Sequence, residues 1–165
     1  MTIVCVAIIS RDNTPLYLKS FSSQIEEIKF AYIVHSALDL LADKCMLAAL
    51  HPVFSLLLTL FSDPPSSFIF SFLFIARGIT EPYLGLLYPT DNFTIYGYLS
   101  NTDVKLIAVL DEGETKDGEI KQFFDTFHSL YLHTISNPFY VMGTAIRSTH
   151  FETELAKLIV TVATN

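Results

Sequence analysis

The sequence predicts an α+β fold with elements in the order β-β-α-β-β-β-α-α, within a single domain of 165 residues. Three observations predict it. The chain opens with an apolar, β-branched run that turn residues join to a second strand. Its middle contains three short strands separated by tight turns, which is typical of an antiparallel meander. Three other segments carry apolar residues at helical spacing.

The first half of the chain predicts a hairpin followed by a helix. Ile3–Ile9 is a continuous apolar run, as expected of a strand buried on both faces. Arg11–Pro15 supplies turn residues and Leu16–Phe21 is the returning strand. Ser23 and Glu26 form a capping box that predicts a helix start. The helix runs to about Lys44, and its predicted apolar face is made of Ile25, Ile28, Ala31, Tyr32, Val34, Leu38 and Leu41.

The second half predicts the meander and two more helices. The strands are Tyr83–Tyr88, Phe93–Leu99 and Val104–Leu110, and a solvated acidic loop follows at Asp111–Gly118. A helix runs from Glu119 to about Ile135, and Pro138 stops it. Its apolar stripe contains Ile120, Phe123, Phe124, Phe127, Leu130 and Tyr131. Thr149 and Glu152 form a capping box for a third helix, lined by Leu155, Leu158, Ile159 and Val162.

An apolar block at Cys45–Ala76 interrupts this pattern and carries one charge, Asp63. It is either a membrane span or an insertion in a cytosolic domain. Its longest uncharged run, Cys45–Ser62, would form a helix of roughly 27 Å, short of the roughly 30 Å hydrocarbon core. Pro52 lies within that run, and Asp63-Pro64-Pro65 breaks the block. These features favour an insertion at about residues 45–79, which would extend the first helix to about His51.

Charge and cysteine content narrow the classes of protein. A net charge of −7 without a Lys/Arg cluster argues against a nucleic-acid partner. Two cysteines, Cys5 and Cys45, are too few for a disulfide framework, and Cys5 is expected in the core. The first residues lack the basic region of a secretory signal, so a reduced cytosolic setting is expected.

Catalytic and metal-binding motifs are missing from the sequence. The five histidines are scattered without metal-ligand spacing, and no glycine-rich phosphate loop or GxSxG elbow occurs. The acidic loop fails the order of an EF-hand. His35 is interpreted as a half-buried histidine or an interface residue. We therefore expect no enzyme activity, no cofactor and no metal.

Several consecutive motifs resemble the sedlin family. They are Asn13–Tyr17, Lys29–Asp39, Tyr83–Thr90 with Tyr96-Gly97-Tyr98, and Asn137-Pro138-Phe139-Tyr140. The likeness covers roughly Thr2–Lys44 and Thr80–Thr164. It implies a longin-like or profilin-like fold, in which a five-stranded antiparallel sheet has one helix on one face and two on the other.

The resemblance also implies a function and a set of contacts. Such proteins are non-catalytic subunits of TRAPP vesicle-tethering complexes, which act between the endoplasmic reticulum and the Golgi and support nucleotide exchange on a Rab-family GTPase. The expected partners are other TRAPP subunits, with peripheral attachment to perinuclear endoplasmic reticulum and Golgi membranes from the cytoplasm. The candidate interface residues are Asp39, His35, Tyr32, Asn137, Pro138 and Phe139. Asp39 matches the aspartate of the family's first-helix motif, or is simply a charge near a helix C-terminus.

The apolar block departs from the family pattern, since relatives have a short polar loop there. Its many Phe, Ser, Leu and Pro residues are those that pyrimidine-rich codons encode. We therefore hypothesise that it is retained non-coding sequence or a splice-variant insertion. Two alternatives to the tethering subunit remain: a membrane-anchored, SNARE-like longin protein, and a small-molecule-binding enzyme of profilin-like fold.

Overall fold

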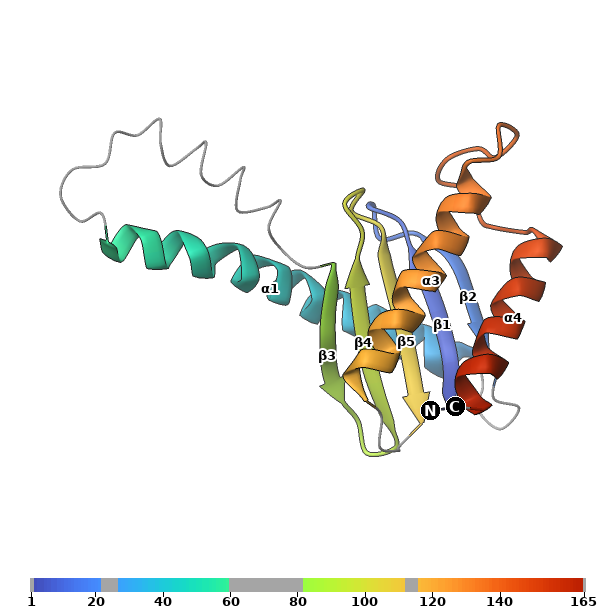
Figure 1. The fold of residues 1–165 in the computed structure, drawn as a ribbon, viewed down its shortest axis with the longest axis horizontal. Coiled ribbons are helices and arrows are strands. Elements are labelled where there is room, and N and C mark those ends of the chain that lie inside the picture. Colours follow the sequence, from blue (N-terminus) through green and yellow to red (C-terminus); the bar gives the residue numbers. More distant parts are fainter. Residues whose placement is uncertain (1, 22–26, 60–81, 112–115, 165) are drawn as a thin grey trace.

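The computed structural model describes residues 2–21, 27–59, 82–111 and 116–164 (Figure 1). Its elements follow the predicted order of two strands, a helix, three strands and two helices. They are β1 (Ile3–Ile9), β2 (Pro15–Ser20), α1 (Glu27–Thr59), β3 (Tyr83–Pro89), β4 (Phe93–Leu99), β5 (Lys105–Asp111), α3 (Asp117–Ile135) and α4 (Thr149–Thr164). Every predicted strand is therefore found within a residue or two of its expected ends.

The five strands form one antiparallel sheet in the order β2-β1-β5-β4-β3. The first hairpin and the later meander meet through β1 and β5, where Ala7 lies opposite Ile107. Two stretches of chain separated by the apolar block therefore share one sheet, as the predicted fold requires. β1 is an interior strand of this sheet, and all seven of its residues are buried. This position explains its uninterrupted apolar sequence.

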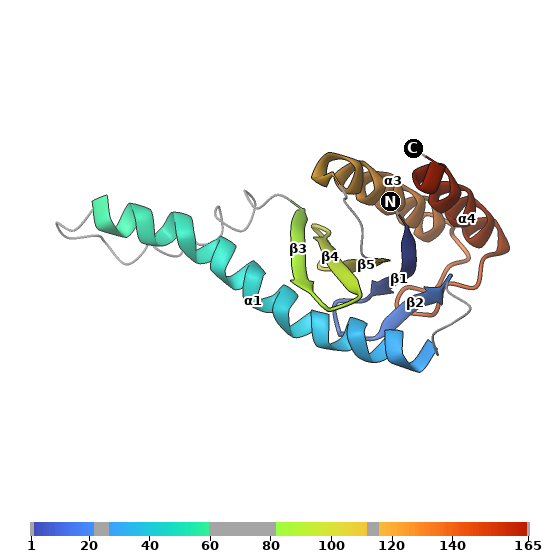
Figure 2. The same cartoon turned by 90° about the horizontal axis from the view of Figure 1, so that it is seen from below.

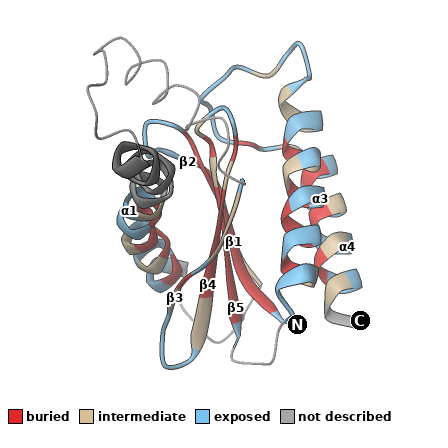
Figure 3. Ribbon diagram, turned by 60° about the vertical axis from the view of Figure 1, so that its left-hand side comes forward, coloured by how far each residue is buried: buried red, intermediate tan, exposed pale blue. Residues whose placement is uncertain are grey.

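Helices cover both faces of the sheet (Figure 3). α1 lies on one face, and its buried residues pack against Cys5, Ile107 and other strand residues; they are Phe30, Val34, Ala37, Leu38 and Leu41. α3 and α4 cover the other face, where Phe123, Phe124 and Phe127 meet Phe151 and Leu155. This confirms the expected arrangement of one helix against two.

Two matching turns lie next to each other because β1 and β5 are neighbours. In each, a serine N–H donates to a carbonyl four residues on: Ser10 to Thr14 at 2.8 Å and Ser100 to Val104 at 2.9 Å. The fourth residue of each turn has a left-handed backbone, with φ of 60° at Asn13 and 61° at Asp103. Asn and Asp tolerate this conformation better than other non-glycine residues, so these turns match their sequence signals.

α1 is longer than predicted. It continues through Pro52 to Thr59 and projects past β3, beyond the sheet (Figures 1 and 2). The expected end near Lys44, or near His51 with the block included, is therefore wrong. A proline costs about 3 kcal/mol inside a helix, but it removes only one backbone donor. The Leu- and Ala-rich sequence around it favours helix, which accounts for the continuation.

The start of α4 corrects a second detail. The predicted cap, Thr149, is the first helical residue, and the capping side chain belongs to Ser148. The Phe151 N–H donates to Ser148 Oγ at 3.3 Å, and the Glu152 N–H donates to the Ser148 carbonyl at 3.1 Å. Both serine and threonine suit this position, so their order alone did not identify the cap. The other predicted box, Ser23 with Glu26, lies outside the described residues.

Candidate functional site: two exposed surfaces and a pocket

The six candidate interface residues form two separate groups. Tyr32, His35 and Asp39 lie on α1, on one face of the sheet. Asn137, Pro138 and Phe139 lie in the loop between α3 and α4, the helices that cover the other face (Figure 2). The structure therefore does not join them into a single site.

The first group belongs to an exposed row on α1, which we call the α1 stripe: Ile28, Tyr32, His35 and Asp39. These positions are three or four residues apart, so they share one helix face. Ile28 is 78% exposed and Tyr32 74%, so their predicted place in the buried face of the helix is wrong. The sheet is covered by the opposite side of α1, and the apolar pattern is simply wider than the face that packs.

His35 and Asp39 also differ from their predicted settings. His35 is exposed rather than half-buried. Asp39 is exposed in the middle of α1, because the helix continues to Thr59. The interpretation of Asp39 as a charge near the helix C-terminus is therefore wrong, since dipole effects are confined to the last turn. Both residues are available to a partner.

The second group lies in the α3–α4 loop, which joins Ile135 to Thr149. Near its start, the side-chain oxygen of Asn137 accepts a hydrogen bond from the Phe139 N–H at 3.0 Å. The Tyr140 hydroxyl donates to the Thr144 carbonyl at 2.6 Å, and the Ile146 N–H donates to the Leu16 carbonyl on β2 at 2.8 Å. These bonds hold three apolar side chains in water: Phe139, Val141 and Met142 are 91%, 66% and 73% exposed.

A pocket of about 540 Å³ opens where the α3–α4 loop meets the two helices. His133 at the end of α3 and His150 at the start of α4 face it, with ring centroids 6.3 Å apart. Arg147, Asn137, Phe139 and Tyr140 line it as well. No acidic side chain is found among the lining residues in the described part of the chain.

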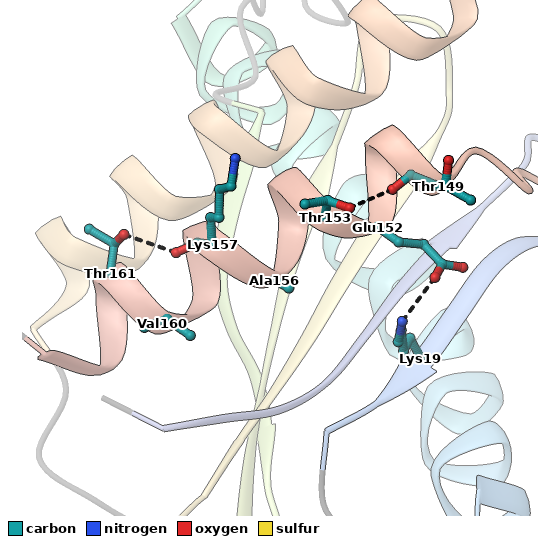
Figure 4. Close-up of a pocket in the computed structure, with 8 residues that line it drawn as sticks. All are labelled: Lys19, Thr149, Glu152, Thr153, Ala156, Lys157, Val160 and Thr161. Carbon is teal, nitrogen blue, oxygen red and sulfur yellow. Dashed lines mark hydrogen bonds and ion pairs between the residues drawn. The ribbon is translucent and has the colours of Figure 1, made fainter.

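A second hollow, of about 710 Å³, is an open groove between α4 and β2 (Figure 4). Lys19 on β2 reaches across to Glu152 on α4, with Nζ and Oε2 3.2 Å apart. Both side chains are close to half exposed, so water screens the pair and it contributes at most about 1 kcal/mol. The pair ties α4 to the edge of the sheet, which is a structural role.

A serine–histidine contact between described residues could suggest nucleophilic chemistry, but it is structural. His128 on α3 bonds through Nε2 with Ser100 Oγ at 3.0 Å and through Nδ1 with the Tyr98 hydroxyl at 3.3 Å. Ser100 is buried, so it is not presented to a substrate. Burial lowers the pKa of His128, although nearby Asp125 acts in the opposite direction. The neutral ring thus joins the β4–β5 turn to α3.

This network predicts a pH-dependent stability. The pKa of His128 lies below its ordinary value of 6.5, so the unfolded chain binds a proton first as the pH falls. The contribution of the neutral ring is therefore complete above about 6.5 and is lost as the pH falls through the folded-state pKa. We expect His128→Gln to flatten the change in unfolding free energy between about pH 7.5 and about pH 5.5. Urea titrations measure this, with His35→Gln as the control; equal slopes in His128→Gln and wild type would contradict it.

Among the described residues, no three His, Cys, Asp or Glu side chains gather closely enough to hold a metal ion. Within the same residues, no helix combines the length and the apolar character that crossing a bilayer requires.

Comparison with known proteins matches the chain to a family. The family model for sedlin matches residues 8–161. The chain belongs to the sedlin family. A relative from Dictyostelium discoideum, called trafficking protein particle complex subunit 2-like protein, is 37% identical over 95% of this chain and 96% of its own. Relatives of the same name are similar in Rattus norvegicus, at 35% identity over 96% and 98%, and in Xenopus tropicalis, at 33% over 95% and 96%.

For this sedlin-family chain, sequence reasoning missed the pocket. His133, Arg147 and His150 form no recognisable sequence motif, and the spacing of the histidines fits no metal site. A signal was present: no acidic residue lies between Asp125 and Glu152, although the whole chain has 17 acidic and 10 basic residues. That local absence of carboxylates marks the region where a cationic pocket forms.

Proposed function

We propose that this chain is a non-catalytic subunit of a TRAPP vesicle-tethering complex. In this role it acts in transport from the endoplasmic reticulum to the Golgi and supports assembly of the machinery that exchanges nucleotide on a Rab-family GTPase. It works without a cofactor, in the cytoplasm, and is held peripherally at perinuclear endoplasmic reticulum and Golgi membranes by its neighbours. Relatives that align over nearly their whole length carry the name of a TRAPP subunit, which supports this assignment.

The structural observation that carries the proposal is the exposure of two large apolar side chains on helix α1. The core is complete without Ile28 and Tyr32, which point into water from α1. Exposed aromatic and aliphatic side chains grouped on one helix face are typical of a protein–protein contact. The α1 stripe supplies two apolar anchors, with His35 and Asp39 as its polar neighbours. The α3–α4 loop supplies a second contact on the far side, as expected of a subunit that bridges two others.

Affinity purification from cells tests the proposal. The tagged wild-type chain should recover other TRAPP subunits, and Ile28→Asp with Tyr32→Asp should lower that recovery by about 10- to 100-fold. Loss of one buried anchor typically costs about 2 kcal/mol, and a buried unpaired carboxylate adds to that cost. Both substitutions are at exposed positions, so the melting temperature of the purified chain should change little.

Val160→Asp is the matched control for the α1 stripe. Val160 is an exposed aliphatic residue on α4, at 62%, and receives the same charge. We expect its variant to recover TRAPP subunits as the wild type does. Recovery that is equal for the control and for the α1 variant would remove the α1 stripe from the interface. Failure of the wild-type chain to recover any TRAPP subunit would defeat the proposed function itself.

A further inference from the structure

The pocket beneath the α3–α4 loop has a charge opposite to that of the protein as a whole. The chain has a net charge of −7, yet the described residues that line this hollow include no carboxylate. The polar groups that face it include the guanidinium of Arg147, the imidazoles of His133 and His150, and the amide of Asn137. All of these groups donate hydrogen bonds. The pocket is therefore suited to an anion.

Arg147 is the strongest feature of the pocket because no described residue of the protein pairs with its guanidinium. Arg11, Lys19, Lys116 and Lys157 each form an ion pair with a carboxylate. Among the residues that the structure describes, none forms a hydrogen bond or an ion pair with Arg147. A guanidinium presents a planar fork of donors that matches a carboxylate with two parallel hydrogen bonds.

The two histidines and the α4 N-terminus reinforce this preference. His133 and His150 come from different helices, and their rings lie 6.3 Å apart on the pocket wall. An anion between them and Arg147 would also lie near the positive end of the α4 dipole. Glu154, one turn after His150, does not line the pocket, and its Oε1 is 2.8 Å from Lys157 Nζ. The Glu154 carboxylate is thus already paired with a lysine.

Apolar groups border the cationic site. Phe139 lines the pocket and is 91% exposed, and Val141 and Met142 follow it along the loop. The loop is held by its own hydrogen bonds and by the Ile146 bond to β2, so these side chains are presented without a large cost in ordering. A ligand that satisfies the whole surface needs a carboxylate and an adjacent apolar side chain.

Charge distinguishes a protein ligand from an anionic membrane. A single Lys or Arg near an anionic surface contributes only a small part of the binding energy, so recognition of lipid usually needs a cluster of them. Here Arg147 is the one permanent cation among the described residues that line the pocket, and the chain as a whole is repelled by an anionic surface. A single arginine beside an exposed phenylalanine fits a short peptide segment better.

We propose that this pocket binds an acidic–apolar segment of a partner subunit. Arg147 pairs with an Asp or Glu carboxylate of that segment, His133 and His150 donate to the same group, and Phe139 packs against the neighbouring apolar side chain. The inference rests on the proposed function, because it describes the chemistry of one contact within the complex.

Peptide titration of the purified full chain tests the pocket directly. The probes are N-acetylated peptides in which Asp or Glu adjoins Phe, Leu or Met, and matched peptides in which Asn or Gln replaces the acid. Fluorescence anisotropy should show binding of acidic members that is at least 10-fold tighter than that of their amide counterparts. Arg147→Gln should weaken the acidic peptides by about 10-fold or more, and Phe139→Ser should weaken acidic and amide peptides alike. Arg11→Gln removes an exposed arginine elsewhere and should leave the affinity unchanged.

The opposing outcomes are separate. Equal affinity for acidic and amide peptides, or an unchanged affinity in Arg147→Gln, would overturn the pocket proposal. Arg147-dependent binding to phosphatidylserine vesicles without peptide binding would also overturn it and assign the pocket to lipid. In cells, the wild-type chain and the Arg147→Gln variant are compared for their recovery of TRAPP subunits. Equal recovery by the two chains refutes the pocket proposal but leaves the proposed function standing. A wild-type chain that recovers none refutes the proposed function, and the titration then decides the pocket alone.

Discussion

Phe124→Ala is expected to lower the free energy of unfolding by about 3–5 kcal/mol, the usual cost of truncating a buried phenylalanine. Phe124 lies on α3 and is fully buried against the sheet. Its ring centroid is 5.8 Å from those of Tyr83 and Tyr98 and 5.6 Å from that of Phe123. These contacts join α3 to β3 and β4, so the cavity would open between the helix and the sheet. Since whole domains are stable by about 5–15 kcal/mol, the variant loses a large part of its margin.

Urea denaturation followed by circular dichroism measures this loss. Phe139→Ala is the matched control, because the same atoms are removed from a side chain that is 91% exposed. Its free energy of unfolding should change by less than about 0.5 kcal/mol. If Phe124→Ala were no less stable than Phe139→Ala, the packing of α3 on the sheet would be wrong.

The strands and the packed face of α3 were predictable from the sequence because burial there follows a simple period. β1 is buried on both faces, so it reads as an unbroken apolar run. On α3, Ile120, Phe123, Phe124, Phe127 and Tyr131 recur at helical spacing, and all are buried. The turns at Asn13 and Asp103 were predictable because those residue types tolerate the left-handed backbone that each turn needs.

The face of α1 was not predictable, because its apolar residues exceed what the sheet can cover. Ile28 and Tyr32 fit the same helical period as Phe30 and Val34, yet only the latter two are buried. Periodicity shows that a helix is apolar, but it does not distinguish a face that packs in the core from one that awaits a partner. Ile28 and Tyr32 on the α1 stripe are exposed although the apolar pattern predicts that they are buried. Functional sites are expected at such departures from local sequence rules.

The pocket could not be predicted from spacing, because its cations come from separate elements. His133 and His150 are 17 positions apart in the sequence and approach only because the α3–α4 loop reverses the chain. Arg147 is significant because it lacks a partner among the described residues, and pairing is a property of the folded chain. The local lack of acidic residues is visible in the sequence, but the arrangement of the basic side chains around one pocket is visible only in the fold.

Removal of residues 46–78 is expected to raise the yield of protein that stays in the supernatant several-fold. The sheet and the helices packed on it should keep their fold. The removed segment is almost entirely apolar, and apolar surface of that extent promotes aggregation. The described packing of α1 is complete before it: Leu41 is buried, and the Lys44 ammonium donates to the Leu86 carbonyl on β3. That bond places the end of the packed helix beside the strand that follows, so Cys45 and residues 79–82 can span the join, reaching roughly 20 Å when extended.

Replacement of residues 46–78 by a Gly/Ser segment of equal length separates the effect of apolarity from that of length. Both variants should remain in the supernatant after centrifugation and should keep the melting temperature of the full chain within about 5 °C, since neither touches the described core. Unchanged sedimentation in both variants would contradict the interpretation of the segment as an insertion outside the fold. Carbonate extraction of membranes tests the alternative of a membrane-anchored protein. A peripheral subunit is released with or without the segment, whereas a full chain that stays in the membrane and a shortened one that leaves it would establish an anchor.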